Sequence, residues 1–213
     1  MKVKRIYVKK KEGFNVEAKG ILADLRENLQ LENLKNVEIY NRYDVFGISD
    51  EVFENAKNTI FSEPQVDEWY TEDIPFREDD IVFGIESLPG QFDQRASSLS
   101  ECLQIIAEGT KPISKSAKIY ILSGNLSKED VDRIKKYLIN PVDSRECSLE
   151  KLETLEETAE EPADVEVCVG FINMTDEDSE KFYNKYGFAM DLADLKFCQN
   201  YFKNIEKRDT KKI

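Results

Sequence analysis

Histidine is absent from the 213 residues of this sequence, and its absence excludes several kinds of catalytic site. Without an imidazole, neither a Ser-His nor a Cys-His nucleophile can be built, and the commonest metal ligand is missing. The sequence has no glycine-rich loop of the kind that cradles phosphate groups. The four cysteines stand singly, without the close spacing of zinc or redox sites: Cys102, Cys147, Cys168 and Cys198. We therefore expect reduced structural thiols, no metal site and no catalytic residue.

Long apolar runs and clusters of basic residues are missing as well. No stretch approaches the roughly 18 apolar residues that a membrane-spanning helix needs. The N-terminal MKVKRIYVKKKEG lacks the apolar core of a signal peptide. The net charge is −13, whereas a general nucleic-acid binder needs clustered Lys and Arg for its phosphate contacts. These features favour a cytoplasmic protein that binds neither membranes nor nucleic acids.

What the sequence does contain is a β-α-β-α-β pattern in its first 73 residues. Period-two alternation predicts strands, and apolar residues that recur every three or four positions predict helices. The expected order is a strand at 3–11, a helix at 18–29, a strand at 36–48, a helix at 52–60 and a strand at 65–70. Ser49 or Asp50 can cap the second helix, and Pro64 ends it.

The same pattern returns between residues 79 and 149. The expected elements are a strand at 80–88, a helix at 96–106, a strand at 117–124, a helix after Ser127 and a strand at 143–149. Landmarks recur in order: Gly13-Phe14 with Gly90 and Phe92, Ala18 with Ala96, Ile39-Tyr40 with Ile119-Tyr120, and Glu63-Pro64 with Asn140-Pro141. The sequence thus predicts an α+β fold in which two tandem β-α-β-α-β repeats, at about 1–73 and 79–149, pack as a pseudo-dimer.

The composition changes after the second repeat. Residues 150–164, EKLETLEETAEEPAD, are acidic and contain few core-forming side chains, which indicates a solvated linker. Beyond it, Thr175 can cap a short helix that ends at Gly187, and Asp191 can begin another. The terminal EKRDTKKI is expected to fray. We predict a duplicated domain at 1–149, an acidic linker at 150–164 and a small helical linker domain at 165–213.

The Pro-Gly turn after the strand at 80–88 carries the main candidate site. LPGQFDQRASS places seven polar or aromatic side chains there: Gln91, Phe92, Asp93, Gln94, Arg95, Ser97 and Ser98. In one interpretation they form an interface loop, with Arg95 pairing with a phosphate or a carboxylate near the helix N-terminus. In the simpler one, Asp93 only caps the helix and Arg95 is solvated, while Ser97 and Ser98 allow close packing.

Three other features have simple interpretations. Trp69 fits half-buried strand packing, and the run Lys9-Lys10-Lys11 fits a solvated strand end. Four aromatic residues near the C-terminus are expected to form a small core rather than a ligand stack: Tyr183, Tyr186, Phe197 and Phe202.

Six blocks of sequence, taken together, resemble one enzyme family. They are KRIYVKKKEGFNVEAKGILADLRENL, NRYDVFGI, FSEPQVDEWY, LPGQFDQRASS, KKYLINPVDSRE and YGFAMDLADLKFCQNYF. In this order they resemble the N-terminal domain and the following linker domain of the long, single-chain phosphoribosylformylglycinamidine synthases, also called formylglycinamide ribonucleotide amidotransferases. These enzymes take ammonia from glutamine and use ATP with Mg²⁺ to convert formylglycinamide ribonucleotide to formylglycinamidine ribonucleotide in purine biosynthesis.

The resemblance implies a role without catalysis. The family's N-terminal domain is similar to two fused copies of a small subunit that other organisms make separately. Its ATP-binding synthase core and cysteine glutaminase lie in segments outside these 213 residues. The chain is then expected to be an assembly module of this ligase, inactive alone and without a cofactor of its own. It would dock the synthase and glutaminase domains, in cis or in trans, and help confine ammonia.

The resemblance also bears on the loop after Pro89-Gly90, which in the family faces the catalytic body. The seven candidate residues would then help to shape an ammonia passage or to cover the ribonucleotide site. Two alternatives stay open for the whole chain. One is a free-standing, small-subunit-like protein that binds the synthase in trans, and the other is an independent α+β domain that binds a small molecule.

Overall fold

The computed structural model describes residues 2–156 and 164–211. The chain divides into two compact units, Met1–Glu157 and Thr158–Ile213. The predicted acidic linker at 150–164 straddles this division, and its residues 157–163 lie outside the described residues. Of its described residues 150–156, all are exposed except Leu155, which is 2% exposed. The first unit therefore extends several residues beyond the predicted boundary.

The first unit contains the predicted alternation of strands and helices. In chain order its elements are β1 (Lys4–Lys10), α1 (Val16–Asn28), β2 (Leu34–Phe46), α2 (Asp50–Ala56), a π-helical turn η1 (Lys57–Phe61), β3 (Asp67–Thr71), β4 (Ile81–Ser87), α3 (Gln94–Ile106), β5 (Ile113–Gly124), α4 (Lys128–Leu138) and β6 (Ser144–Cys147). Ser49 caps α2 through the N–H of Val52, and Ser127 caps α4 in a capping box with Asp130. These caps explain why each helix begins where it does.

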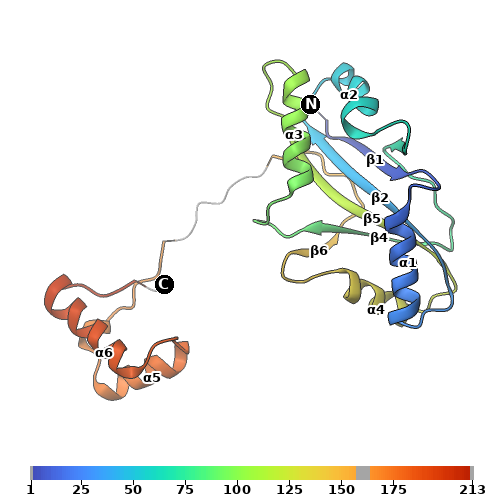
Figure 1. Ribbon diagram of the computed structural model, residues 1–213. Coiled ribbons are helices and arrows are strands. Elements are labelled where there is room, and N and C mark those ends of the chain that lie inside the picture. The colour runs from blue at the N-terminus through green and yellow to red at the C-terminus, as the bar shows by residue number, and fades with distance from the viewer. Residues whose placement is uncertain (1, 157–163, 212–213) are drawn as a thin grey trace. The chain divides into compact units, whose positions relative to one another are not determined.

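All six strands form one antiparallel sheet in the order β3-β1-β2-β5-β4-β6 (Figure 1). The two central strands, β2 and β5, are nearly twice as long as their neighbours and pair from Leu34–Gly124 to Phe46–Ile113. The strands of residues 1–73 lie on one side of this central ladder, and those of residues 79–149 lie on the other. The α+β class predicted from the sequence is confirmed.

Four helices cover one face of the sheet and bury the main core. Alternation along β2 directs Val37, Ile39 and Val45 to this face. Helices α2 and α3 pack with η1 over one part of the face, and α1 and α4 pack over the other (Figure 1). The largest fully buried side chains on this face are Phe83, Ile6, Leu25, Leu34, Leu103, Leu122, Ile134 and Val45.

The opposite face of the sheet carries a second apolar cluster. It contains Tyr7, Tyr40, Ala117, Ile119, Ile121 and Cys147, and Ile74 from the β3–β4 connection packs against it. Burial raises the pKa of the Cys147 thiol, which agrees with the expected structural role, whereas Cys102 is exposed. The landmark match of Ile39-Tyr40 with Ile119-Tyr120 is wrong by one residue. Ile39 and Tyr120 share the helix-covered face, while Tyr40 and Ile119 share this one.

A buried ion cluster lies on this second face. Arg5 donates to Asp44 from Nε to Oδ1 at 2.6 Å and from Nη2 to Oδ2 at 2.9 Å, and Arg42 Nε lies 3.3 Å from Asp44 Oδ2. Burial lowers the pKa of Arg5, but its hydrogen bonds and charge interaction with Asp44 outweigh this effect and leave the pKa raised. Both arginines also donate to main-chain carbonyls that follow β6, those of Ser148, Leu149 and Glu150. The cluster therefore fixes the chain that leaves the sheet.

The second unit is mainly helical, as predicted. Its elements are η2 (Phe171–Asn173), α5 (Asp176–Tyr186), α6 (Leu192–Tyr201) and η3 (Phe202–Glu206). Thr175 and Asp191 cap α5 and α6 with capping boxes, and Gly187 ends α5 at a φ of 60°, a conformation that glycine adopts without strain.

The C-terminal segment is not frayed as far as Lys211, contrary to expectation. The carboxylate of Asp209 accepts hydrogen bonds from the N–H groups of Gly170 at 2.8 Å and Ile172 at 3.1 Å. These bonds hold the pKa of Asp209 below its ordinary value. Lys211 forms an isolated bridge with Val167. Among the described residues of both units, no helix is long and apolar enough to cross a membrane.

Candidate functional site

Two hollows in the first unit lie beside corresponding loops. The first, about 220 Å³, adjoins the loop from β1 to α1 and is lined by Lys9, Lys10, Glu12, Asn15, Glu17, Ala18, Asn36, Val37, Glu38, Ile39, Asn41 and Glu68. The second, about 310 Å³, adjoins the loop from β4 to α3 and is lined by Glu86, Ser87, Leu88, Pro89, Gly90, Gln91, Asp93, Ala96, Ser114, Lys115, Ser116 and Arg145. We call them the loop-1 hollow and the loop-2 hollow. The predicted site falls partly in the second.

Asp93 has a structural role at the loop-2 hollow. Its Oδ1 accepts the N–H of Ala96 at 2.9 Å and so caps α3, as the simpler interpretation predicted. Its Oδ2 also accepts the N–H of Ser116 at 3.1 Å, and the Ser116 hydroxyl donates to the same carboxylate at 2.9 Å. Pairing between β4 and β5 ends at Lys118, so Asp93 occupies the open edge of β5 beyond β4. This second contact joins α3 to the sheet.

The other predicted site residues do not converge on this hollow. Gln91 lines it, but the side chain of Phe92 is 77% exposed. Gln94, Arg95 and Ser98 line a separate open groove beside α3. Arg95 Nη1 donates to the Tyr43 hydroxyl at 3.3 Å, and the Ser97 hydroxyl donates to Glu101 at 3.4 Å. The seven residues therefore divide between a capping contact, a groove and an exposed loop tip.

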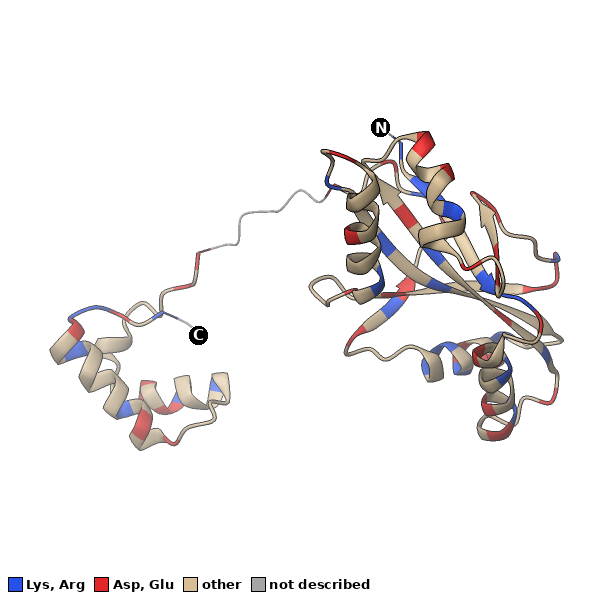
Figure 2. Cartoon of the chain, turned by 45° about the horizontal axis from the view of Figure 1, so that its top comes forward, with Lys and Arg blue, Asp and Glu red and all other residues tan. Residues whose placement is uncertain are grey.

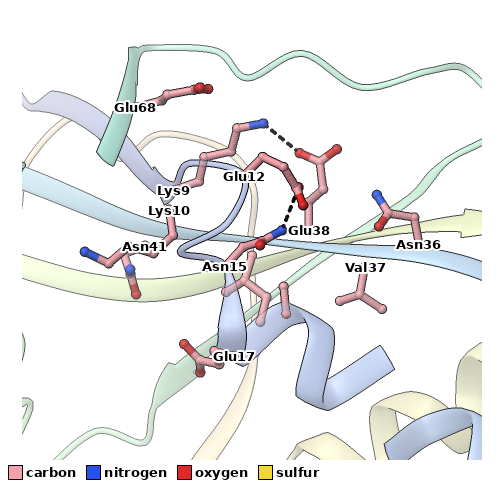
Figure 3. A pocket seen from close by; sticks show the side chains of 12 residues that line it. Lys9, Lys10, Glu12, Asn15, Glu17, Asn36, Val37, Glu38, Asn41 and Glu68 are labelled. Atoms are coloured by element: carbon pink, nitrogen blue, oxygen red, sulfur yellow. Dashed lines mark hydrogen bonds and ion pairs between the residues drawn. The ribbon is translucent and has the colours of Figure 1, made fainter. Parts of the chain in front are cut away.

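The loop-1 hollow differs from the loop-2 hollow in its polar contacts (Figure 3). Asn15 occupies the N-cap position of α1 but makes no capping hydrogen bond. Its Nδ2 donates to Glu12 Oε2 at 3.2 Å, which turns its Oδ1 away from Glu12. The Oδ1 atoms of Asn15 and Asn41 are both buried, and neither has a hydrogen-bond partner within residues 2–156 and 164–211. Sequence reasoning missed this hollow, because asparagine at this position ordinarily indicates a cap.

We predicted that Lys9 belongs to a solvated strand end, but in the structure it takes part in a polar network. Its Nζ lies 2.9 Å from Glu38 Oε2 (Figure 3). The Tyr40 hydroxyl donates to the same oxygen at 3.1 Å. Burial lowers the pKa of Lys9, but the hydrogen bonds with Glu38 and Tyr40 outweigh it and leave the pKa raised. Burial also raises the pKa of Tyr40 to about 12. The network joins β1 to β2 where their pairing ends.

Trp69 packs as predicted, and the second unit holds an apolar cavity. Trp69 lies partly buried against the core and donates from Nε1 to Asn58 Oδ1 at 2.9 Å. The cavity, of about 370 Å³, is lined mainly by apolar side chains, and its aromatic ones are Phe171, Phe182, Tyr186, Phe188 and Phe202. Tyr186 and Phe202 thus belong to an aromatic cluster, but Phe197 does not, because its side chain is 74% exposed.

Within residues 2–156 and 164–211, no group of three or more cysteine, aspartate or glutamate side chains is arranged to hold a metal ion. At the loop-2 hollow the Ser116 hydroxyl donates to the Asp93 carboxylate, whereas the buried Oγ of Ser114 has no hydrogen-bond partner among the described residues. The chain matches no family model, and no curated protein matches it significantly.

Proposed function

We propose that the chain is a non-catalytic assembly module of a glutamine- and ATP-dependent phosphoribosylformylglycinamidine synthase, the function that its sequence resemblance implies. The module docks on the catalytic body, holds the synthase and glutaminase domains together and helps to confine ammonia. ATP and Mg²⁺ are bound by that body and not by this chain. The observation that carries the proposal is the matched construction of the two halves of the first unit.

The halves match element by element. β1 and β4 have seven residues each, and α1 and α3 have thirteen each. The N-cap residues Asn15 and Asp93 are separated by the same number of positions as the N-cap residues Ser49 and Ser127. The strand order is β3-β1-β2-β5-β4-β6. If each strand of the first half is exchanged for its counterpart in the second half (β1 for β4, β2 for β5, β3 for β6), the same order results, read from the opposite edge of the sheet. This pattern favours two tandem repeats that pack as a pseudo-dimer, as expected of two fused small subunits.

The central ladder is compatible with the same symmetry. A twofold axis perpendicular to an antiparallel pair must pass through two facing residues, and Tyr40 faces Ile119 near the middle of β2 and β5. Such an axis makes each half supply one edge of the same continuous sheet. Hydrogen bonds across β2 and β5 then join the halves, so the duplicated unit needs no partner to complete its sheet.

The loops that follow β1 and β4 are the docking elements in this proposal. Gly13 and Gly90 hold positive φ values of 91° and 86°, which give both loops a tight turn. Each turn presents an exposed phenylalanine, Phe14 at 53% and Phe92 at 77% exposure. Aromatic side chains exposed on rigid loops are typical anchors of protein interfaces. The candidate residues after Pro89 thus act as an interface loop in which Asp93 fixes the backbone.

The test combines this chain with a separately produced synthase–glutaminase body of the family. We expect no ATP hydrolysis and no glutaminase activity from the chain alone. The chain should bind the body in isothermal titration calorimetry and raise glutamine-dependent product formation relative to ammonia-dependent formation. Steady ATP turnover by the pure chain, or no binding at high micromolar concentration, would contradict the proposal.

A loop variant makes this test specific. Phe92→Ala should weaken binding about tenfold or more, the loss expected when an aromatic anchor at an interface is removed. Phe76→Ala is the matched control, because Phe76 is also exposed, at 58%, but lies in the connection between β3 and β4. Equal binding by both variants would exclude the loop after Pro89 as a docking element.

A further inference from the structure

Helix α6 and the turn η3 that follows it carry apolar side chains on two sides. Leu195, Cys198 and Phe202 recur at spacings of three and four residues, and all three line the apolar cavity of the second unit. This inner side also makes polar contacts with the unit, because Gln199 Nε2 donates to the carbonyls of Phe171 at 3.0 Å and Met174 at 2.9 Å. The inner side therefore accounts for the packing of α6 in its own unit.

A second apolar row lies on the outer side of the same segment. Phe197, Tyr201 and Ile205 recur every four residues, which places them along one side of the helix. Their exposed fractions are 74%, 44% and 68%, and none of them lines the cavity. We call these three residues the outer stripe. It is bordered by Asn200 and Asn204, whose side-chain amides bond to each other, so no charge interrupts the stripe on that side.

The outer stripe is an unusual surface for so small a unit. Among the described residues of the second unit, the only apolar side chains that are fully buried are Phe171 and Leu195. A unit that buries so little apolar surface, while a contiguous row of large apolar side chains stays in water, has the features of a protein–protein contact. A partner that covers the stripe would remove this apolar surface from water.

Charge indicates which kind of partner fits. Lys203, Lys207 and Arg208 gather at the end of η3, with Glu206 as the one acidic residue among them. Figure 2 shows this basic turn at the end of the second unit's helices. The rest of the chain is strongly acidic, since the net charge is −13. A surface that is apolar along the stripe and acidic where it meets the basic turn complements this segment.

Two copies of this chain that met through their stripes alone would form too small an interface. An aromatic side chain buries roughly 150–250 Å² when fully covered. From their exposed fractions, the stripe residues of two copies would bury less than about 800 Å² together, whereas a specific interface buries more than about 1,000 Å². The partner must therefore extend beyond the three residues of the stripe.

We propose that the outer stripe docks in an apolar groove with an acidic rim on the catalytic body. The inference rests on the proposed function, which supplies that body as the partner. It assigns to the second unit a binding role of its own, separate from the loops of the first unit. Helix α6 is then packed on both sides, by its own cavity on one and by the body on the other.

The test uses the full chain and the separately produced synthase–glutaminase body. The double variant Phe197→Ser/Ile205→Ser should raise the dissociation constant at least tenfold, because the stripe supplies the anchors of the contact. Lys203→Glu/Lys207→Glu should slow association and reduce its dependence on salt. The matched control is Ile105→Ser on α3, since Ile105 is 80% exposed but lies in the first unit.

Folding of the variants is checked by the amide signals of Gly170 and Ile172, which bond to Asp209 and report an intact second unit. If the wild-type chain binds and the stripe variant binds equally well, the stripe is not the docking surface and the proposed function still stands. If the wild-type chain does not bind, the proposed function fails, and this inference fails with it. If sedimentation shows a dimer that the stripe variant abolishes, the stripe joins two copies and the proposal is wrong.

Discussion

Asp44→Asn should strongly destabilise the first unit, because it removes the one negative charge between two buried guanidinium groups. The side chains of Arg5 and Asp44 are 3% and 5% exposed, and that of Arg42 is 7% exposed. Asparagine has nearly the same shape as aspartate, so the substitution changes the charge and leaves the packing. One oxygen acceptor becomes an N–H donor that faces a guanidinium group, and two positive charges then share a site without a counter-charge.

The magnitude follows from the burial of this cluster. Removing one partner of a buried ion pair costs about 3–5 kcal/mol. We expect about 3 kcal/mol here, because Arg5 and Arg42 keep their hydrogen bonds to the carbonyls of Ser148, Leu149 and Glu150. With a urea dependence of about 2 kcal/mol per M, this loss lowers the unfolding midpoint by about 1.5 M. It is a large part of the 5–15 kcal/mol typical of a folded domain.

The assay is urea unfolding followed by the fluorescence of Trp69. It is the single tryptophan of the chain and lies in β3, so the signal reports the first unit alone. The control is Glu12→Gln, which removes an exposed ion pair with Lys19 and should leave the midpoint unchanged within error. If Asp44→Asn gives the same midpoint as this control, the buried cluster does not stabilise the sheet as argued.

Three further predictions use the same unit. Asp93→Ala should cost about 1–2 kcal/mol, whereas Asn15→Ala should cost nearly nothing, because only Asp93 makes a capping bond; equal midpoints in urea would contradict this. Gly84→Ala should cost about 1–3 kcal/mol, because the added Cβ would lie against buried side chains of β5 and β6, and an unchanged midpoint would show that the strands can separate. Burial raises the pKa of Tyr40 and Tyr120 to about 12. Above about pH 10 the native state therefore holds more protons than the unfolded chain, and its free energy of unfolding should fall as the pH rises. The absorbance of tyrosinate should show these two tyrosines ionising last.

The order of strands and helices could be predicted because each element leaves a local pattern. Alternation along β1 and helical spacing along α1 depend only on neighbouring residues, and the capping residues mark where helices begin. The pairing of strands in the sheet could not be predicted in this way, because it joins segments that are distant in the sequence. Nothing near Tyr40 in the sequence indicates that it faces Ile119, and a shift of one residue moves every side chain to the other face. The misplaced landmark match has this cause.

The buried ion cluster could not be predicted for a related reason. Arg5 and Asp44 are distant in the sequence, and each lies in a strand whose local pattern does not indicate that they meet. The chain after β6 returns across that face of the sheet, where the carbonyls of Leu149 and Glu150 accept from Arg5, and Ile74 packs on the apolar cluster of the same face. Alternation gives the two faces of a strand but does not say which chain covers the second one.

The candidate site was predictable only in its local part. A capping role for Asp93 follows from the helix that begins after it. Its bonds to Ser116 do not, because the polar start of β5 gave no strand pattern and the predicted strand began after it. The outer stripe was missed because Phe197 was assigned to a core. A helix in a small unit was expected to have one apolar side, and α6 has two.

The two hollows differ in a way that matters for the docking role we propose. The backbone of the two loops is alike, since Gly13 and Gly90 both have positive φ values and a helix follows each. Their polar contacts differ, because the Asp93 carboxylate bonds to Ala96 and Ser116, whereas the buried Oδ1 of Asn15 has no partner among the residues that the structure describes. A buried acceptor without a donor costs free energy until a donor reaches it. The first loop can therefore gain a hydrogen bond on docking that the second already has, so the two halves need not bind alike.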